Sequence, residues 1–212
     1  MSLSELVHIP SGEIVATDVP VEEYEEKYAP HFCEWVNGTV IKMSPVKDKH
    51  DKLTRYFAKL LEAYFEFRPI GQIRQAPFLM RLAGRRREPD LQVILHTNPH
   101  ELADSGMNGP ADICIEIVSL DSIQRDHGEK FEEYEKGGVG ECWIIDPLRS
   151  ETRFYRRNAD GIFIRQEPDA NGNYRTPLLP GIVLHVPTLW EDDLPGPGAT
   201  SKAVEVMLDN ES

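Results

Sequence analysis

Apolar residues recur at helical spacing in the stretch from Lys47 to Phe67. They lie three or four positions apart, which places them on one face of a helix. These residues are Leu53, Phe57, Leu60, Leu61, Tyr64 and Phe65. Because an apolar stripe of this kind has to be covered by another element, we expect a long amphipathic helix that packs on a sheet.

Shorter apolar runs predict the strands of that sheet. Upstream of the helix, residues 33–36 and 39–43 flank Asn37 and Gly38, a pair that tolerates the positive φ angles of a two-residue hairpin turn. Downstream, four further runs are typical of strands: residues 72–75, 77–82, 89–95 and 111–118. The last two are largely apolar, as expected of central strands that are buried on both faces.

A second helix is predicted between two buried strands. Residues 122–138 combine a capping serine with apolar contacts at helical spacing and a Gly-Gly stop at the end. The apolar run 142–147 follows at once, and the order strand, helix, strand predicts a right-handed crossover within a mixed sheet. Asp146, before Pro147, is interpreted as the residue that forms the turn at the end of that strand.

The remaining patterns complete an α/β (α+β) fold. They are an acid-rich short helix at residues 19–28, a hairpin at 152–156 and 162–166, and a short strand at 181–186. At 212 residues the chain is near the upper limit of the usual single domain. We therefore expect one domain over residues 1–190, with a mixed central sheet flanked by helices and an N-terminal β-hairpin. An acidic, flexible tail is expected over residues 191–212.

Composition indicates an ordinary folded protein without membrane segments. Hydrophobic residues make up 40% and charged residues 28%, and no apolar run approaches the ~20 residues needed to cross a bilayer. Residues 1–10 lack the basic and apolar regions of a secretory signal, so we expect a soluble, cytoplasmic protein with no membrane partner. Cys33, Cys114 and Cys142 are odd in number and lie in apolar segments, which favours core positions over a disulfide or a zinc site.

Two acidic residues are notable because of where the strand pattern places them. Asp90 opens one predicted strand, and Glu116 lies in the middle of another, within the otherwise apolar run 113–118. Burying an unpaired carboxylate is costly, so Glu116 needs a cation or a metal ion beside it. Two carboxylates on adjacent central strands suit Mg²⁺, which takes one or two protein carboxylates and keeps some of its water. A buried ion pair without a metal is the alternative for Glu116.

A basic residue on the second predicted helix extends this set. Lys130 lies 14 positions after Glu116, with Asp126 four positions before it and Tyr134 four positions after it. Residues four apart share one face of a helix, so these three side chains are expected together. The alternative is that Asp126 and Lys130 form only an exposed i,i+4 ion pair, which adds little to stability.

Several motifs occur in the order found in one known family. They are Pro89-Asp90, the run Asp112 to Ser119, Asp126, Lys130, Tyr134, Gly138-Val139 and the run Glu141 to Pro147, with Glu34 to Gly38, Met43 to Pro45 and His50 upstream and Leu179 to Gly181 and Leu189-Trp190 downstream. Together these motifs resemble the Uma-two family, whose members are described as putative restriction endonucleases. The resemblance covers residues 21–190.

The resemblance implies the PD-(D/E)XK nuclease fold, which is restriction-endonuclease-like, with Asp90 and Glu116 as its acidic pair. The nuclease motif proper has its lysine two positions after the second acid, but Val118 stands there. The equivalent basic residue is then Lys130 on the following helix. Asp90 and Glu116 would hold Mg²⁺ or Mn²⁺, and Lys130 would position the attacking water or stabilise developing charge during hydrolysis of a DNA phosphodiester.

Two residues further upstream are candidates for the same cleft. Glu34, on the first hairpin, would act as a further metal ligand or as a partner of the ligands; the alternative is an ordinary exposed acid in a strand. His50 would support the site from the start of the long helix, and the alternative is a histidine without a function there.

A basic stretch directly upstream of Asp90 is predicted to contact the substrate. It contains Arg85, Arg86 and Arg87, with Arg81 a few positions earlier. Arginines at this place would position the phosphates of DNA, because phosphate contacts set the register of a bound nucleic acid. The alternative is a solvated turn between two strands.

The acidic net charge is unfavourable for binding DNA and favours functions other than a nuclease. The formal net charge is −13, whereas phosphate binding relies on Lys and Arg. Six acids against one lysine give residues 191–212 a net charge of −5, which leaves −8 for the rest. The alternatives are a catalytically silent module that binds nucleic acid or protein, and a metal-dependent hydrolase of small phosphate esters. For a nuclease that cuts duplex DNA, homodimerisation would suit cleavage of both strands.

Overall fold

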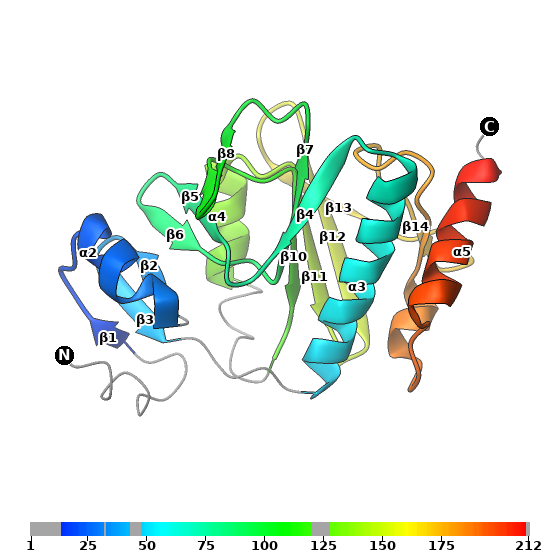
Figure 1. Cartoon of the computed structure of the whole chain (residues 1–212), viewed down its shortest axis with the longest axis horizontal. Coiled ribbons are helices and arrows are strands. Elements are labelled where there is room, and N and C mark those ends of the chain that lie inside the picture. The colour runs from blue at the N-terminus through cyan, green and yellow to red at the C-terminus, as the bar shows by residue number, and fades with distance from the viewer. Residues whose placement is uncertain (1–13, 32, 43–47, 120–127, 211–212) are drawn as a thin grey trace.

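Two mixed β-sheets, one of seven strands and one of six, make up most of the fold together with four α-helices (Figure 1). These elements belong to the residues that the computed structural model describes, which are 14–31, 33–42, 48–119 and 128–210. A third, small sheet consists of β14 (Asn173–Tyr174) and β15 (Leu184–His185), and the 3-10 helix η3 (Val186–Trp190) follows it.

The six-stranded sheet has β10 and β11 at its centre. β10 (Ile113–Ile117) runs parallel to β11 (Glu141–Asp146) and antiparallel to β7 (Leu91–Leu95). The outer strands are β4 (Gly71–Gln75), β12 (Glu151–Arg157) and β13 (Phe163–Gln166). All residues of β10 are buried, because both faces of the strand are covered, and this explains its continuous apolar run.

Helix α3 (Asp48–Phe67) packs along one face of this sheet. The core on this side includes Leu53, Phe57, Leu60, Leu61, Ile113, Ile115 and Trp143. The rings of Phe57 and Trp143 lie 6.5 Å apart between their centroids. The predicted apolar stripe is therefore the surface by which α3 joins the sheet.

Helix α4 (Lys130–Gly137) covers the opposite face. Side chains of a strand alternate between the two faces, so Cys114 of β10 points toward α4 while Ile113 and Ile115 point toward α3. Gly138 ends α4 in the left-handed conformation (φ 93°), as expected from the Gly-Gly stop.

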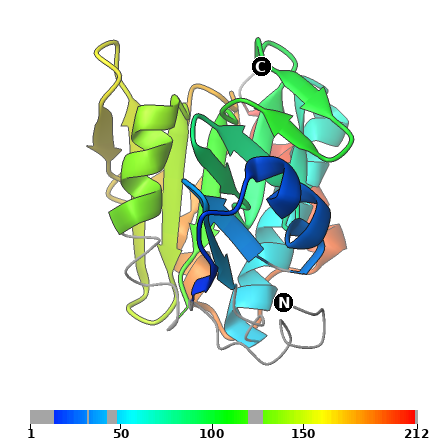
Figure 2. The same ribbon diagram turned by 90° about the vertical axis from the view of Figure 1, so that its left-hand side faces the viewer.

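The seven-stranded sheet lies on the N-terminal side of the molecule (Figure 2). Its strands, in spatial order, are β1 (Ile14–Ala16), β3 (Thr39–Lys42), β2 (Cys33–Val36), β6 (Arg85–Arg87), β5 (Leu79–Leu82), β9 (Gly106–Asn108) and β8 (Glu101–Ala103). Asn37 and Gly38 take the positive φ angles of the predicted β2–β3 turn. The short helices α2 (Val21–Lys27) and η1 (Ala29–His31) precede β2.

Glu141 attaches the C-terminal segment to the six-stranded sheet. Its carboxylate is fully buried and accepts hydrogen bonds from the side chains of Trp143 at 2.9 Å, Tyr174 at 2.9 Å, Thr176 at 2.7 Å and Arg156 at 2.6 Å. These bonds offset the cost of burying its charge. Residues 174–176 are thereby held against β11.

Most of the predicted elements are confirmed, including the hairpin, the long helix and the buried strands β7, β10 and β11. Cys33, Cys114 and Cys142 are free and buried, as expected of core residues. The start of the second predicted helix, with its capping serine, lies outside the described residues. Among those residues, no helix combines the length and the apolar surface needed to cross a membrane.

The expected mixed central sheet flanked by helices is the six-stranded sheet, but some of the predicted strands belong to the second sheet. The strand predicted at residues 77–82 is β5, which pairs with β6 and β9 instead of joining β4 and β7. The basic stretch Arg85–Arg87 is strand β6 and not a loop. The turn lies one position earlier, at Gly84 with φ 67°, where the chain reverses from β5 into β6.

The prediction of a flexible tail is also wrong for most of that segment. Residues Pro197–Asp209 form helix α5, which packs beside α3 (Figure 1). Val204 and Leu208 lie four positions apart on one face of α5 and are buried in the same core as α3. Pro197 stands at the first helical position, where proline is favoured, so the Pro-Gly stretch introduces a helix.

Truncation of Leu208 tests whether α5 is part of the folded core. We expect Leu208→Ala to lower the free energy of unfolding by about 2–3 kcal/mol, because it removes buried methyl groups and leaves a cavity. Val206→Ala is the matched control, since this side chain is 51% exposed on the same helix. Urea denaturation measures both, and equal stability of the two variants would contradict the packing of α5.

Candidate active site

Glu116 is the buried carboxylate at the centre of the candidate site. Only 2% of its surface is exposed. The ammonium of Lys130 donates to its Oε2 at 3.0 Å, and the hydroxyl of Tyr134 donates to its Oε1. Lys130 and Tyr134 are four positions apart, so one turn of α4 supplies both partners. Burial and the Glu116 carboxylate together raise the pKa of Tyr134 well above its usual value, so this hydroxyl keeps its proton.

Lys130 also joins Glu116 to a second buried carboxylate. Its Nζ lies 3.4 Å from Oε1 of Glu34 in β2. Glu34 is fully buried and accepts a hydrogen bond from Nη1 of Arg87 at 2.6 Å and one from the backbone N–H of Glu88 at 3.4 Å. The ammonium therefore connects β10 of one sheet with β2 of the other.

Arg87 and Glu133 complete a network of ion pairs. Nε of Arg87 donates to Oε2 of Glu133 at 2.7 Å, and Nε of Arg85 lies 2.9 Å from its Oε1. Burial disfavours the charge of Arg87, but Glu34 and Glu133 outweigh this effect and raise its pKa. We call Glu34, Glu116, Glu133, Lys130, Arg87 and Arg85 the ion network. Counted over the described residues, its three carboxylates match its three cations.

Glu88 carries a carboxyl group next to this network. It is 6% exposed, and burial, reinforced by the Glu34 carboxylate, raises its pKa to about 8 although Lys130 acts in the opposite direction. The group therefore holds its proton at neutral pH and adds no uncompensated charge.

Asp90 lies beside Glu116 across two strands. The antiparallel register of β7 and β10, continued by one residue, places Asp90 opposite Glu116. Its Oδ2 accepts the backbone N–H of Ile117 at 2.7 Å and lies 3.1 Å from Nε2 of His50 in α3. Asp90 keeps 20% of its side chain exposed, so this acid, unlike Glu116, is open to solvent.

The donor set suits a cation that keeps part of its water. Within the described parts of the chain, no three His, Cys, Asp or Glu side chains are grouped so as to hold a metal ion by themselves. Asp90 and Glu116 stand opposite each other in the register of adjacent strands, and Mg²⁺ takes one or two protein carboxylates with water as its other ligands. The charge of Asp90 is also additional to the neutral ion network. Two carboxylates on adjacent strands would suit Mg²⁺ or Mn²⁺ better than a closed zinc site, which needs more ligands.

Comparison with known families identifies the chain at the family level. The family model described as Uma2, putative restriction endonuclease, matches residues 21–187. The chain belongs to the Uma2 family. The matched region contains Asp90, Glu116 and Lys130. No curated protein matches the chain.

A solved structure shares the fold of this Uma2 member. It is the crystal structure of a putative nuclease belonging to DUF820 from Anabaena variabilis, with a TM-score of 0.62 and 19% sequence identity. The superposition covers 90% of this chain and 97% of the other. The likeness therefore extends over nearly the whole mixed α/β fold.

The structure brings most of the predicted site residues of this Uma2 protein together. Glu34, Glu116, Lys130 and Tyr134 are in contact through the ion network, and Asp90 and His50 form a pair beside them. Asp126 lies outside the described residues.

The predicted substrate arginines are instead engaged with carboxylates. Arg86 pairs with Glu25 at 3.0 Å and lies over the ring of Trp35. Arg85 and Arg87 belong to the ion network, and Arg87 is fully buried. From this place the guanidinium of Arg87 orients Glu34 and does not face a surface where a phosphate would bind.

Glu133 of the ion network and Glu88 beside it were missed from the sequence. Glu133 lies three positions after Lys130, so the helical spacing that indicated Tyr134 would also have found it. Glu88 has no such signal, because its burial depends on strands that are distant in sequence.

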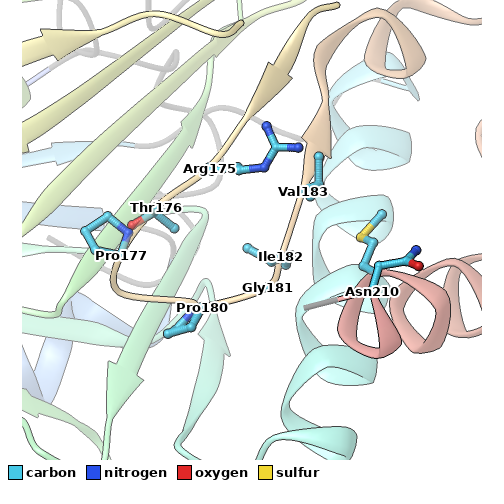
Figure 3. A pocket seen from close by; sticks show the side chains of 9 residues that line it. Arg175, Thr176, Pro177, Pro180, Gly181, Ile182, Val183 and Asn210 are labelled. Atoms are coloured by element: carbon cyan, nitrogen blue, oxygen red, sulfur yellow. The ribbon is translucent and has the colours of Figure 1, made fainter. Parts of the chain in front are cut away.

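A hollow of about 490 Å³ lies elsewhere, between residues 175–183 and the end of α5 (Figure 3). It adjoins the carboxyl end of α3, since Arg68 and Tyr64 both donate to the carbonyl oxygen of Pro180. His50 lies near the other end of α3, roughly 27 Å away at the rise of an α-helix. The hollow is thus separate from the candidate active site.

Replacement of Glu88 tests the charge state of the site. The folded chain keeps the Glu88 proton up to about pH 8, whereas an unfolded chain loses it near pH 4.5. Between these values the unfolded state binds fewer protons, so the wild type loses stability with rising pH while Glu88→Gln does not suffer this loss. We expect the free energy of unfolding of Glu88→Gln, relative to that of the wild type, to rise by roughly 1 kcal/mol per pH unit across this window. Urea denaturation at several pH values measures this difference.

The matched control for this experiment is Glu66→Gln, an exposed position of α3. Its stability is expected to follow the wild type at every pH. Parallel pH curves for Glu88→Gln and the wild type would show that Glu88 is ionised in the folded chain.

Proposed function

We propose that this Uma2 protein is a metal-dependent endonuclease that hydrolyses phosphodiester bonds of DNA. The observation that carries the proposal is the contact of 3.0 Å between Lys130 and the buried Glu116, beside the partly exposed Asp90. Buried ionisable side chains gather at functional sites more often than elsewhere, and a nuclease uses two acids and a lysine together. Membership of the Uma2 family supports the same class of reaction.

Asp90 and Glu116 would hold Mg²⁺ or Mn²⁺ in this enzyme. When bound, such an ion polarises the scissile phosphate and lowers the pKa of an attacking water. Asp90 is held for this role by the N–H of Ile117 and by His50, which both contact Oδ2. Glu116 is oriented in the same way by Tyr134 and Lys130.

Lys130 would stabilise the negative charge that develops on the phosphate, or position the attacking water. Its amino group is already desolvated by burial, so it needs little reorganisation when the reaction begins. The Glu34 carboxylate also contacts the Lys130 ammonium and so restricts its position. Arg87 pairs with Glu34 and fixes that carboxylate. In this scheme Glu34 and Arg87 position Lys130 and do not touch the substrate.

One observation favours a second candidate, a catalytically silent module that binds nucleic acid or protein on the same fold. Both oxygens of Glu116 already have partners, and the ion network is neutral without a metal ion. A net charge of −13 also opposes binding to DNA.

Cleavage of DNA distinguishes the two candidates. We expect the wild type to cut supercoiled or single-stranded DNA with Mg²⁺ or Mn²⁺ and not in EDTA. Asp90→Asn is expected to lower the rate by about a hundredfold, because it removes one charged ligand and keeps the shape of the side chain. Asp104→Asn, at an exposed turn, is the control prepared in parallel. Absence of cleavage by folded wild type on both substrates would favour the silent module.

Calorimetry tests the metal site without reference to activity. We expect Glu116→Gln and Asp90→Asn each to weaken Mg²⁺ binding by about tenfold or more, since each loses a carboxylate ligand. Asp104→Asn should bind like the wild type. If Glu116→Gln retained the affinity of the wild type, Glu116 would be removed from the metal site.

A further inference from the structure

Lys49 and Arg149 are exposed cations at the edge of the sheet where Asp90 lies. Lys49 is in the first turn of α3, next to His50, and its Nζ donates to the carbonyl oxygen of Pro147 at 3.3 Å. Arg149 lies in the turn between β11 and β12, with 54% of its side chain exposed. One hydrogen bond therefore connects the start of α3 with the turn that carries Arg149.

The turn that carries Arg149 is held rigid by Asp146, which is 1% exposed. Oδ1 of Asp146 accepts the backbone N–H groups of Leu148 at 2.9 Å and Arg149 at 3.2 Å, and its Oδ2 pairs with Nη1 of Arg149 at 2.7 Å. The predicted turn-forming role of Asp146 is thus confirmed. Nε and Nη2 of Arg149 have no partner among the described residues, so they are open to a ligand.

The acids in the first turn of α3 are already matched by cations. Asp48 pairs with Lys52 at 2.9 Å, and Asp51 pairs with Arg55. Lys49 makes no ion pair with a described residue, although it lines a small surface hollow together with Glu191 and Asp192. Two of its three N–H donors have no acceptor in the described parts of the chain, because its one contact there is the carbonyl of Pro147.

We propose that Lys49 and Arg149 bind backbone phosphates that flank the scissile phosphodiester of DNA. This inference rests on the proposed function, and it moves the phosphate contacts from β6 to α3 and the β11–β12 turn. Phosphate oxygens would accept charge-assisted hydrogen bonds from the N–H groups that Lys49 and Arg149 still have available. Two cations on different elements place available N–H donors at the edge where the substrate has to approach Asp90, and a phosphate responds to such nearby donors even on a protein of acidic net charge.

The test is steady-state cleavage of a DNA duplex by the full chain with Mg²⁺ over a range of NaCl concentrations. We expect Lys49→Ala and Arg149→Ala each to raise KM about two- to fivefold, because each loses an exposed ion pair with phosphate, while kcat stays unchanged. The dependence of log KM on log salt should fall by about 0.9 for each lost contact. Lys49→Arg and Arg149→Lys keep the charge and should restore the salt dependence.

Two matched control variants are expected to behave like the wild type. Arg175→Ala removes an arginine that is 58% exposed and paired with one aspartate, as Arg149 is, but far from Asp90. Lys136→Ala removes an exposed lysine at the end of α4.

Unchanged KM and salt dependence in Lys49→Ala and Arg149→Ala, with an active wild type, would overturn the inference and leave the proposed function intact. A fall in kcat alone would also overturn it, because the cations would then act on the chemical step. If the wild type neither cuts nor binds the duplex, the proposed function fails, and this inference fails with it.

Discussion

The burial of the Glu116 charge in β10 is the constraint on which the rest of the site depends. A carboxylate in this place has to be neutralised, and Lys130 does so from α4. Bringing Lys130 into the interior creates a second buried charge, which Glu34 shares. Arg87 balances the charge of Glu34 and also pairs with Glu133. Glu133 pairs in turn with Arg85, which is 26% exposed at the surface. Removing any inner member would leave a buried charge without its partner, which is strongly destabilising.

This ion network also explains how the two sheets keep a fixed position relative to each other. Glu34 and Arg87 belong to the seven-stranded sheet, whereas Glu116 belongs to the six-stranded sheet, and α4 supplies the residues between them. Apolar packing alone tolerates small shifts, but an ion pair displaced in the interior loses its hydrogen bonds. The network therefore selects one arrangement of β2, β6, β10 and α4. The same arrangement brings Asp90 and Glu116 to one edge.

The charged residues around the site form two groups, one buried and one exposed to solvent, and the two groups have different roles. The inner group orients Glu116 and Lys130 and excludes water from them. The outer group, which includes Asp90, Lys49 and Arg149, faces solvent at the carboxyl ends of β10 and β11. An acidic net charge does not by itself prevent contacts with phosphate, because such contacts depend on the nearby donors more than on the total charge.

The sequence by itself determined the elements whose side chains alternate or recur along one segment. Helix α3, the β2–β3 hairpin and β10 follow from such local periods, and so do the buried place of Glu116 and the shared face of Lys130 and Tyr134. Only the tertiary structure decided which segment covers each face. The division into two sheets, the burial of Arg87 and Glu88, and the packing of α5 on α3 depend on contacts between distant segments. A local pattern states that a face is apolar or charged, but the partner that completes it is set by packing and charge balance across the whole chain.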